Sequence, residues 1–298
     1  MSSLVRVCAT VLLFYACGLY GSHMTTKAAD ACAQALRALE RKMLKRFDKL
    51  EDGVSKCCRP PPKETYASCR EIYLSHNFHK SAGNKAYSLK TRGGKIPVYC
   101  HMTRNGIGKC GGGGWTLVMK IDGHKQTFHY DSSYWTKKIS FNPQGGATGF
   151  DHRQTKLPTY WSTPFSKICL AMKLGTEMRS FVAHMRANSL HSLIADGKYR
   201  KTSNGRDTWK SLIGRRASLQ EHCNREGFNV MSDSGPGSSK ARIGILSNNE
   251  NNCWSCDSRI GFGTGSPKWR FLNSNTCGNS HGYDAKVQIK TMGYILVQ

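Results

Sequence analysis

Acidic side chains are scarce in this chain of 298 residues, which has 19 Asp and Glu against 44 Lys and Arg and a formal net charge of +25. This balance argues against a protein that gathers cations through its overall charge. It indicates anionic partners instead, such as nucleic acid, acidic glycans, anionic lipid or an acidic matrix. Composition alone does not decide among these partners.

Motifs of known catalytic chemistry are also missing. The sequence contains no Gly-x-Ser-x-Gly, no His-Glu-x-x-His and no paired acidic motif, which are signatures of nucleophilic, zinc-dependent and acid–base catalysis. The glycine run 111–114 lacks the Gly-Lys-Ser/Thr ending of a phosphate-binding loop, so we interpret it as a turn that leads into a strand. We therefore predict that the protein is not an enzyme.

Long apolar runs are absent except at the N-terminus. Residues 7–20 are almost all apolar, Arg6 precedes them, and small residues follow up to residue 22. This run is shorter than the roughly 20 residues that span a bilayer, and it has the layout of a secretory signal peptide. We predict a signal peptide at residues 1–22, with an uncleaved anchor as the alternative, and a secreted mature chain without a membrane span. Secretion argues against a specific nucleic-acid partner.

Cysteine, in contrast, is abundant. Thirteen cysteines are more than a typical cytosolic enzyme carries and indicate an oxidising compartment. Removal of the signal peptide takes away Cys8 and Cys17, so that 13 minus two leaves eleven. An odd number in a secreted chain predicts a free thiol or a bond to another chain.

Residues 23–63 form a first predicted segment. Residues 30–56 contain good helix formers, and Leu36, Met43 and Leu50 share one heptad position of a short coiled-coil seam. The Arg-Pro-Pro-Pro-Lys run that follows, at 59–63, predicts a stiff linker. The helix either docks on its own domain or joins protomers into a homo-oligomer. The flanking cysteines favour a homo-oligomer, and the candidates for intermolecular disulfides are Cys32, Cys57 and Cys58.

Residues 64–298 follow without a second linker, and we predict that they form one mixed α+β domain. Short apolar or aromatic stretches broken by Gly, Asn, Ser and Pro are typical of strands and ordered loops. The predicted strands are 95–101, 115–121, 167–173, 179–184, 241–246 and 293–297, and the predicted short helices are 133–136 and 211–219.

Three motifs at the start of this domain are specific: SCREI at 68–72, KIPVYCHM at 95–102 and GGGWTLV at 112–118. They resemble the opening of fibrinogen C-terminal-like domains, which include the fibrinogen-like lectins and the intelectins. The resemblance implies a fibrinogen C-terminal-like domain after the N-terminal helix, and a disulfide between Cys69 and Cys100. The Asp-x-Asp calcium loop of fibrinogen has no counterpart here, so calcium-dependent recognition of acetyl groups is not carried over.

Beyond Trp115 the chain is similar to the secreted skeletal organic matrix proteins of stony corals that carry this domain. The similarity covers roughly residues 65–298 and depends on FHYD at 128–131, TGFD at 148–151, TKLPTYW at 155–161, ICLAMK at 168–173, SLIADGKYR at 192–200, NNENNC at 248–253, DSRIGFG at 257–263 and MGYILV at 292–297. It implies residence in an extracellular, biomineral-associated matrix.

The remaining cysteines of this domain are expected in structural disulfides. Cys253 and Cys256 form a Cys-x-x-Cys, but no second pair and no close His pair completes a zinc site. We therefore predict that Cys277 is bonded to one of these two, and that Cys169 is bonded to Cys223.

The loop at 248–257 is the best candidate binding feature. Its amide and carboxylate oxygens suit calcium, a hard cation that takes six to eight oxygen ligands. The alternative is a tight loop in which the Asn side chains cap their own backbone. The candidate calcium ligands are Asn248, Asn249, Glu250, Asn251 and Asp257.

Two functional hypotheses follow. The first is a secreted, non-enzymatic component of a skeletal extracellular matrix, whose domain binds anionic glycans or acidic matrix polymers. The second is a calcium-dependent lectin of innate recognition, related to the fibrinogen-like lectins or intelectins. Binding that weakens with salt favours the first hypothesis, and binding that a chelator abolishes favours the second.

Overall fold

A computed structural model describes residues 26–57, 65–75, 83–103, 107–235, 238–266, 275–281 and 287–298. The chain divides between Lys63 and Glu64 into two compact units, which is where the sequence predicts a boundary. The predicted signal peptide, the linker at 59–63 and Cys58 lie outside the described residues. The side chains of Cys32 and Cys57 lie outside them as well.

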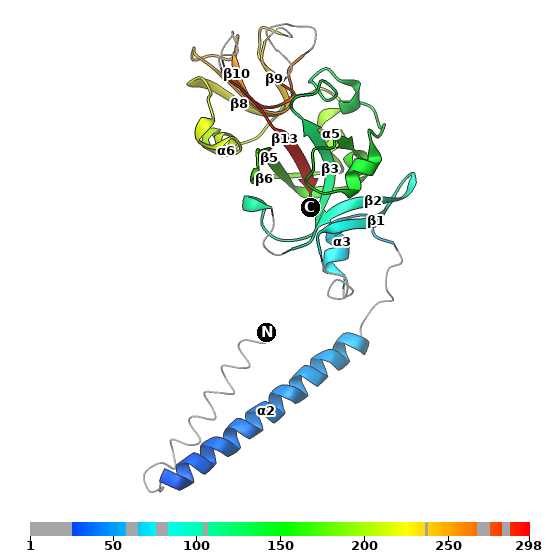
Figure 1. Ribbon diagram of the computed structural model, residues 1–298, viewed down its shortest axis with the longest axis vertical. Coiled ribbons are helices and arrows are strands. Elements are labelled where there is room, and N and C mark those ends of the chain that lie inside the picture. The colour runs from blue at the N-terminus through cyan, green and yellow to red at the C-terminus, as the bar shows by residue number, and fades with distance from the viewer. Residues whose placement is uncertain are drawn as a thin grey trace. The chain divides into compact units, whose positions relative to one another are not determined.

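The first unit contains the long helix α2 (Thr26–Cys57), which is blue in Figure 1. Its 32 residues correspond to about 48 Å of helix, and it begins four residues before the predicted start. Leu39, Met43, Phe47 and Leu50 follow one another at helical spacing and are between 39% and 62% exposed. We call them the apolar stripe.

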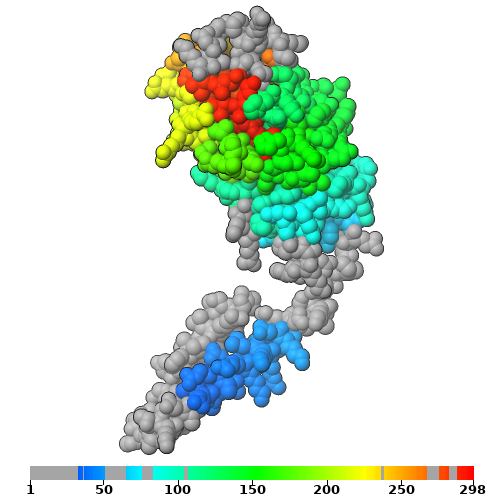
Figure 2. Space-filling model, in the orientation of Figure 1, coloured from blue at the N-terminus to red at the C-terminus, as the bar shows by residue number. Residues whose placement is uncertain are grey.

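The second unit contains two sheets in which every strand pair is antiparallel. The first sheet has the order β1-β2-β3-β13-β5-β6, with β4 paired to β3. Its strands are β1 (Lys85–Thr91), β2 (Gly94–His101), β3 (Trp115–Asp122), β4 (Thr155–Lys156), β5 (Phe165–Leu174), β6 (Glu177–Ala187) and β13 (Met292–Val297). The C-terminal strand thus lies between β3 and β5, and Figure 2 shows C-terminal residues, in red, among green and yellow segments.

The second sheet has the order β12-β11-β10-β9-β8-β7. Its strands are β7 (Arg200–Lys201), β8 (His222–Met231), β9 (Lys240–Asn248), β10 (Ser258–Thr264), β11 (Cys277–His281) and β12 (Val287–Lys290). The short helix α3 (Cys69–Leu74) precedes β1, and further short helices lie between strands: η2 (Gly108–Cys110), η3 (Ser133–Trp135), η4 (Pro143–Ala147), α4 (Thr159–Ser162), α5 (Leu190–Ile194), α6 (Arg206–Ser211) and η5 (Gly214–Arg216). Figure 1 labels the larger elements.

One hydrophobic core is shared by the two sheets. The first sheet contributes Val118 and Ile295, the second contributes Ile243 and Phe262, and Trp135 of η3 is also fully buried there. A core to which both sheets contribute side chains fixes the position of one sheet against the other. It therefore also fixes the loops that leave the sheet edges.

The mixed helix-and-sheet class is confirmed, and each of the six predicted strands lies within an observed strand. The predicted helix at 133–136 corresponds to η3. Only part of the predicted helix at 211–219 is helical, since α6 ends at Ser211 and the short 3-10 helix η5 covers Gly214–Arg216. Gly214 has a φ of +79°, a left-handed conformation that interrupts a continuous α-helix.

A row of four glycines crosses the second sheet. Each is the register partner of the next, in the order Gly227 of β8, Gly244 of β9, Gly261 of β10 and Gly278 of β11. A Cβ atom on Gly244 would lie 2.5 Å from the carbonyl oxygen of Ile260, so the backbones approach too closely for a side chain. Glycine lowers strand propensity, and three of the four strands in the row, β8, β10 and β11, are not among the predicted strands, whereas β9 is.

Three disulfides join described residues. The bridge between Cys69 and Cys100 is the one that the resemblance implies, and its sequence separation of 31 corresponds to a stabilisation of about 4 kcal/mol. Cys169 of β5 is bonded to Cys110 of η2, a cysteine for which the sequence predicts no partner. The predicted bond between Cys169 and Cys223 is therefore wrong. Cys223 is bonded to Cys253 instead.

Cys256 and Cys277, both expected in bridges, are buried free thiols. Cys277 belongs to the core shared by the two sheets, where its Sγ lies 3.5 Å from Thr291 Oγ1. Cys253 and Cys256 belong to a separate cluster in the second sheet, so the predicted bond from Cys277 to either of them is wrong. Burial raises the pKa of the Cys277 thiol to about 12, which keeps it protonated and unreactive.

We predict that Gly244→Ala destabilises the second unit. The new Cβ would collide with the Ile260 carbonyl oxygen and with Ala241 Cβ, so that strands β9 and β10 must shift apart. The expected loss is about 1–3 kcal/mol in the free energy of unfolding, measured by urea denaturation with the disulfides intact.

Gly93→Ala is the matched control, because a Cβ atom at this position would have no other atom within 4 Å and the φ of Gly93 is ordinary. This variant should keep or slightly gain stability. Equal unfolding midpoints for the two variants would show that the glycine row does not constrain the sheet.

Candidate functional site

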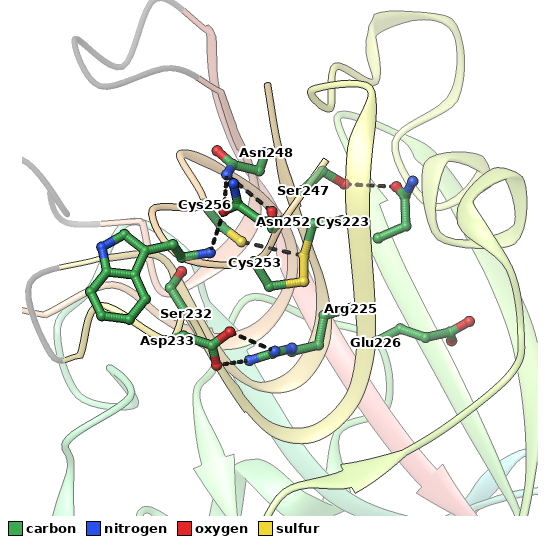
Figure 3. Close-up of a disulfide and its surroundings, with 12 residues drawn as sticks. Cys223, Arg225, Glu226, Ser232, Asp233, Ser247, Asn248, Asn252, Cys253 and Cys256 are labelled. Carbon is green, nitrogen blue, oxygen red and sulfur yellow. Dashed lines mark hydrogen bonds and ion pairs between the residues drawn. A yellow bond between two sulfur atoms is a disulfide. The ribbon is translucent and has the colours of Figure 1, made fainter. Parts of the chain in front are cut away.

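Three sulfur atoms gather where β8 begins and where the loop 249–257 joins β9 to β10, as Figure 3 shows. Cys223 and Cys253 form a disulfide, and Cys256 Sγ lies 3.5 Å from Cys223 Sγ. We call these three residues the sulfur cluster. Within the described ranges, it is the only group of three or more His, Cys, Asp or Glu side chains placed closely enough to hold a metal ion.

The backbone of β8 is irregular at the sulfur cluster. Cys223 and Asn224 have φ values of 66° and 50°, and the register with β9 shifts between His222 and Arg225. A bulge of this kind redirects side chains and increases local twist. Arg206 Nη1 donates to Asn224 Oδ1 at 2.8 Å and so supports this unusual conformation.

Backbone hydrogen bonds hold the loop 249–257 against the segment between β8 and β9. Asp233 N donates to Cys253 O at 2.9 Å, and Ser239 N donates to Cys256 O at 3.2 Å. Cys256 is buried and Cys253 is half-buried. Trp254, between them in sequence, is 64% exposed.

A salt bridge lies beside the sulfurs (Figure 3). Arg225 donates to both carboxylate oxygens of Asp233, at 2.6 and 2.9 Å. This contact lowers the pKa of Asp233 and raises that of Arg225. Burial raises the pKa of the Cys256 thiol, whereas a hydrogen bond with Ser232 and the charge of Arg225 act in the opposite direction. At neutral pH the site is therefore mainly a thiol in contact with an intact disulfide.

The amide groups of the predicted calcium ligands are used within the loop. Asn248 is buried and its Nδ2 donates to Asn252 O at 3.1 Å. Asn249 Nδ2 donates to Glu250 Oε1 at 3.0 Å, and Asn252 Oδ1 accepts from Trp254 N at 2.8 Å. These contacts match the alternative in which Asn side chains cap their own loop.

The other two predicted calcium ligands do not join a common oxygen cluster. Asn251 is exposed, and Asp257 Oδ2 accepts from Gln220 Nε2 at 3.3 Å. Asn248 Oδ1 is buried without a hydrogen-bond partner. Calcium takes six to eight oxygen ligands, and among the described residues this loop holds no close group of three acidic side chains. Calcium at this loop remains a prediction, and this geometry does not favour it.

Several buried charges were not predicted from the sequence, because their burial depends on segments that are distant in the chain. Lys240 donates to both oxygens of Asp131 at 3.0 and 2.8 Å, and Lys120 forms an ion pair with Asp151. Glu226 accepts hydrogen bonds from four residues, Thr202, Asn204, Gly205 and Trp209. The two lysines are buried, whereas Asp131 and Asp151 are partly exposed. Removing the partner of a buried charge is strongly destabilising, so these contacts support the fold.

Lys156 is fully buried and has no carboxylate partner among the described residues. Its Nζ donates to the carbonyl oxygens of Lys137 and Ile139. The ring centroids of Tyr160 and Trp161 lie 4.5 and 5.1 Å from the same nitrogen. Burial lowers the pKa of Lys156 to about 7, because these neutral groups replace only part of the hydration of an ammonium ion.

Comparison of the chain with protein-family models and with curated proteins finds no match. No helix in the described part of the chain has both the length and the apolar character needed to cross a membrane.

We predict that Lys156 makes the stability of the second unit rise with pH. Its pKa is about 7 in the folded chain and about 10.4 in an unfolded one. Between these values the unfolded state binds more protons, so the free energy of unfolding increases with pH, by at most about 1.4 kcal/mol per pH unit. In Lys156→Met this contribution is absent. Urea denaturation at about pH 7, 8 and 9 should therefore show that the free energy of unfolding rises less with pH than in the wild type.

Lys138→Met is the control, since Lys138 is exposed. This variant should show the same dependence of the free energy of unfolding on pH as the wild type. If the curves of Lys156→Met and wild type run parallel from about pH 7 to 9, the buried amine is not responsible for the dependence.

Proposed function

We propose that this protein is a secreted, non-enzymatic component of a biomineral-associated extracellular matrix, whose second unit binds anionic glycans or acidic matrix polymers. The net charge of +25 supports anionic partners. Three disulfides between described residues are compatible with an extracellular protein. The similarity to skeletal matrix proteins supports the mineral setting. The observation that carries the proposal is a cluster of basic side chains on one hairpin.

The hairpin formed by β1 and β2 presents three unpaired cations. Lys90 and Lys95 are direct cross-strand partners, and Arg92 lies in the turn that joins them. All three are exposed, and none forms an ion pair with any described residue. The hairpin, cyan in Figure 2, lies at the surface. We call these three residues the basic hairpin tip.

Like charges on directly opposed strand positions repel each other. An anionic polymer that lies across the basic hairpin tip removes this repulsion and releases its own counterions. Five cations elsewhere in the described chain do not reach such a polymer, because they are buried: Lys120, Lys156, Lys240, Arg242 and Arg259. Binding therefore depends on exposed clusters more than on the total charge.

We predict that binding to heparin, a sulfated glycan probe, weakens at least about tenfold between low and high salt, because exposed charges are screened beyond about 8 Å at physiological ionic strength. Neutralising the basic hairpin tip with Lys90→Gln, Arg92→Gln and Lys95→Gln should weaken binding several-fold further at low salt. Affinity is measured by surface plasmon resonance over a salt series, with and without a calcium chelator.

The matched control is the triple variant Lys137→Gln, Lys138→Gln and Lys201→Gln, which removes the same charge from other exposed positions. If both triple variants lose the same affinity, binding depends on overall charge and not on the hairpin. Binding that is insensitive to salt but requires calcium would support the lectin hypothesis instead.

We further propose that α2 joins protomers through its apolar stripe and the cysteines that flank it. Non-reducing electrophoresis should show multimers that become monomers on reduction. The triple variant Cys32→Ser, Cys57→Ser and Cys58→Ser should run as a monomer under both conditions but still sediment as an oligomer at neutral pH. Adding Met43→Glu and Leu50→Glu should abolish this association, because charges in a coiled-coil seam are strongly unfavourable. A wild-type protein that is monomeric by both methods would exclude assembly through α2.

A further inference from the structure

The sulfur cluster carries chemistry that the proposed function does not use. Two free thiols are present among the described residues, Cys256 and Cys277. Cys277 has Thr291 Oγ1 beside its sulfur, whereas Cys256 has the sulfur of Cys223, a member of a disulfide, at 3.5 Å. A thiol in contact with a disulfide is the reactant pair of thiol–disulfide exchange.

We propose that Cys223, Cys253 and Cys256 form a thiol–disulfide exchange site, which presents Cys253 as a thiol for mixed-disulfide formation with an external disulfide. In the first step the Cys256 thiolate attacks Cys223 Sγ. The bond between Cys223 and Cys256 forms, the bond between Cys223 and Cys253 breaks, and Cys253 leaves with the electron pair. The proton that Cys256 loses to solvent is regained at Cys253. One thiol and one disulfide are present before and after, so no oxidant is required.

The two bridge isomers differ in the exposure of their free thiol. In the structure the free thiol is Cys256, which is only 1% exposed. After exchange the free thiol is Cys253, which is half-buried and next to Trp254, a residue that is 64% exposed. The second isomer therefore offers a sulfur that molecules in solution can reach.

In the second step the Cys253 thiolate attacks an external disulfide, such as oxidised glutathione. A bond forms between Cys253 and one sulfur of that disulfide, and the other sulfur leaves as a thiolate. The number of disulfides and thiols is again conserved. The product is a chain with a bond between Cys223 and Cys256 and a covalent adduct at Cys253.

Two features of the fold prepare the first step. The bulge at Cys223 turns its sulfur toward the loop 249–257. Backbone hydrogen bonds from Asp233 and Ser239 hold the carbonyl groups of Cys253 and Cys256. Attack requires the thiolate to approach along the axis of the bond that breaks, so the rate also depends on side-chain rotation into that alignment.

The charged and polar groups around Cys256 have opposing effects on the pKa of its thiol. Ser232 and the guanidinium of Arg225 favour its thiolate, whereas burial and the carboxylate of Asp233 oppose it, and burial dominates. Only a small fraction of Cys256 is thiolate at neutral pH, because its pKa is raised above the ordinary value. The exchange is therefore slow, and acid stops it, which allows the two isomers to be separated and mapped.

The experiment uses the oxidised full-length chain and oxidised glutathione as the external disulfide, without added thiol. After incubation at about pH 8, acid quenching and proteolysis, mass spectrometry maps each bond and adduct. We expect the glutathione adduct on Cys253, in molecules that carry a bond between Cys223 and Cys256. Cys277 is the internal control, since it is a buried free thiol without a disulfide in contact, and its adduct should be at least about tenfold less abundant.

Two variants test the same site independently. In Cys256→Ser the attacking thiol is absent, so the adduct on Cys253 should be lost and the bond between Cys223 and Cys253 retained. In Cys253→Ser the secreted chain should form the bond between Cys223 and Cys256, with unchanged binding of heparin. An adduct confined to Cys256, an adduct on Cys253 that persists in Cys256→Ser, or a free Cys223 in Cys253→Ser would each overturn the proposal. If Cys253→Ser is not secreted, the adduct map of the wild-type chain still decides.

Discussion

The close approach of four backbones along the glycine row is the constraint on which the second sheet depends. Gly227, Gly244, Gly261 and Gly278 are register partners in consecutive strands, and a side chain at these positions would force the strands apart. Register in a sheet determines which residues meet at the ends of neighbouring strands. Because the strands are antiparallel, the start of β8, the end of β9 and the start of β10 lie at the same end of the sheet. The sulfur cluster lies at that end, so its geometry is a consequence of packing in the middle of the sheet.

The positively charged side chains of this molecule form two groups, one buried inside the fold and one exposed at its surface. Lys120 and Lys240 are buried against Asp151 and Asp131, and Lys156 is buried against carbonyl groups and aromatic rings. These cations connect distant segments, and burial removes them from contact with any polymer. An acid-poor chain that also uses carboxylates inside its fold has few left to neutralise its exterior. Exposed cations therefore remain unpaired where they cluster, as they do at the basic hairpin tip.

The sequence predicted those parts of the fold that depend on local pattern. Apolar strands such as β13 were found with nearly correct bounds, because β-branched and aromatic residues mark them. Three of the four strands that carry the glycine row, β8, β10 and β11, were missed, because close backbone packing is a property of the sheet and not of any one segment. The fourth, β9, was found from the apolar residues on either side of Gly244. The same reason applies to the wrong bridges: Cys169 meets Cys110 only after β5 packs near η2. The cysteines and asparagines of the candidate site were identified by type, but their partners depend on contacts across strands.

The odd number of cysteines indicates a free thiol or a bond to another chain, without saying which cysteine is involved or whether it reacts. Burial raises the pKa of both free thiols among the described residues, Cys256 and Cys277, so thiolate formation alone does not separate them into reactive and inert. What separates them is the neighbouring atom, a hydroxyl oxygen for Cys277 and a bonded sulfur for Cys256. Exchange needs only a thiolate and a disulfide in contact, so a weakly acidic thiol can still react if the contact is permanent. In an oxidising compartment, where disulfides are plentiful, such a contact allows the buried thiol to be replaced by a more accessible one without any change in the number of bridges.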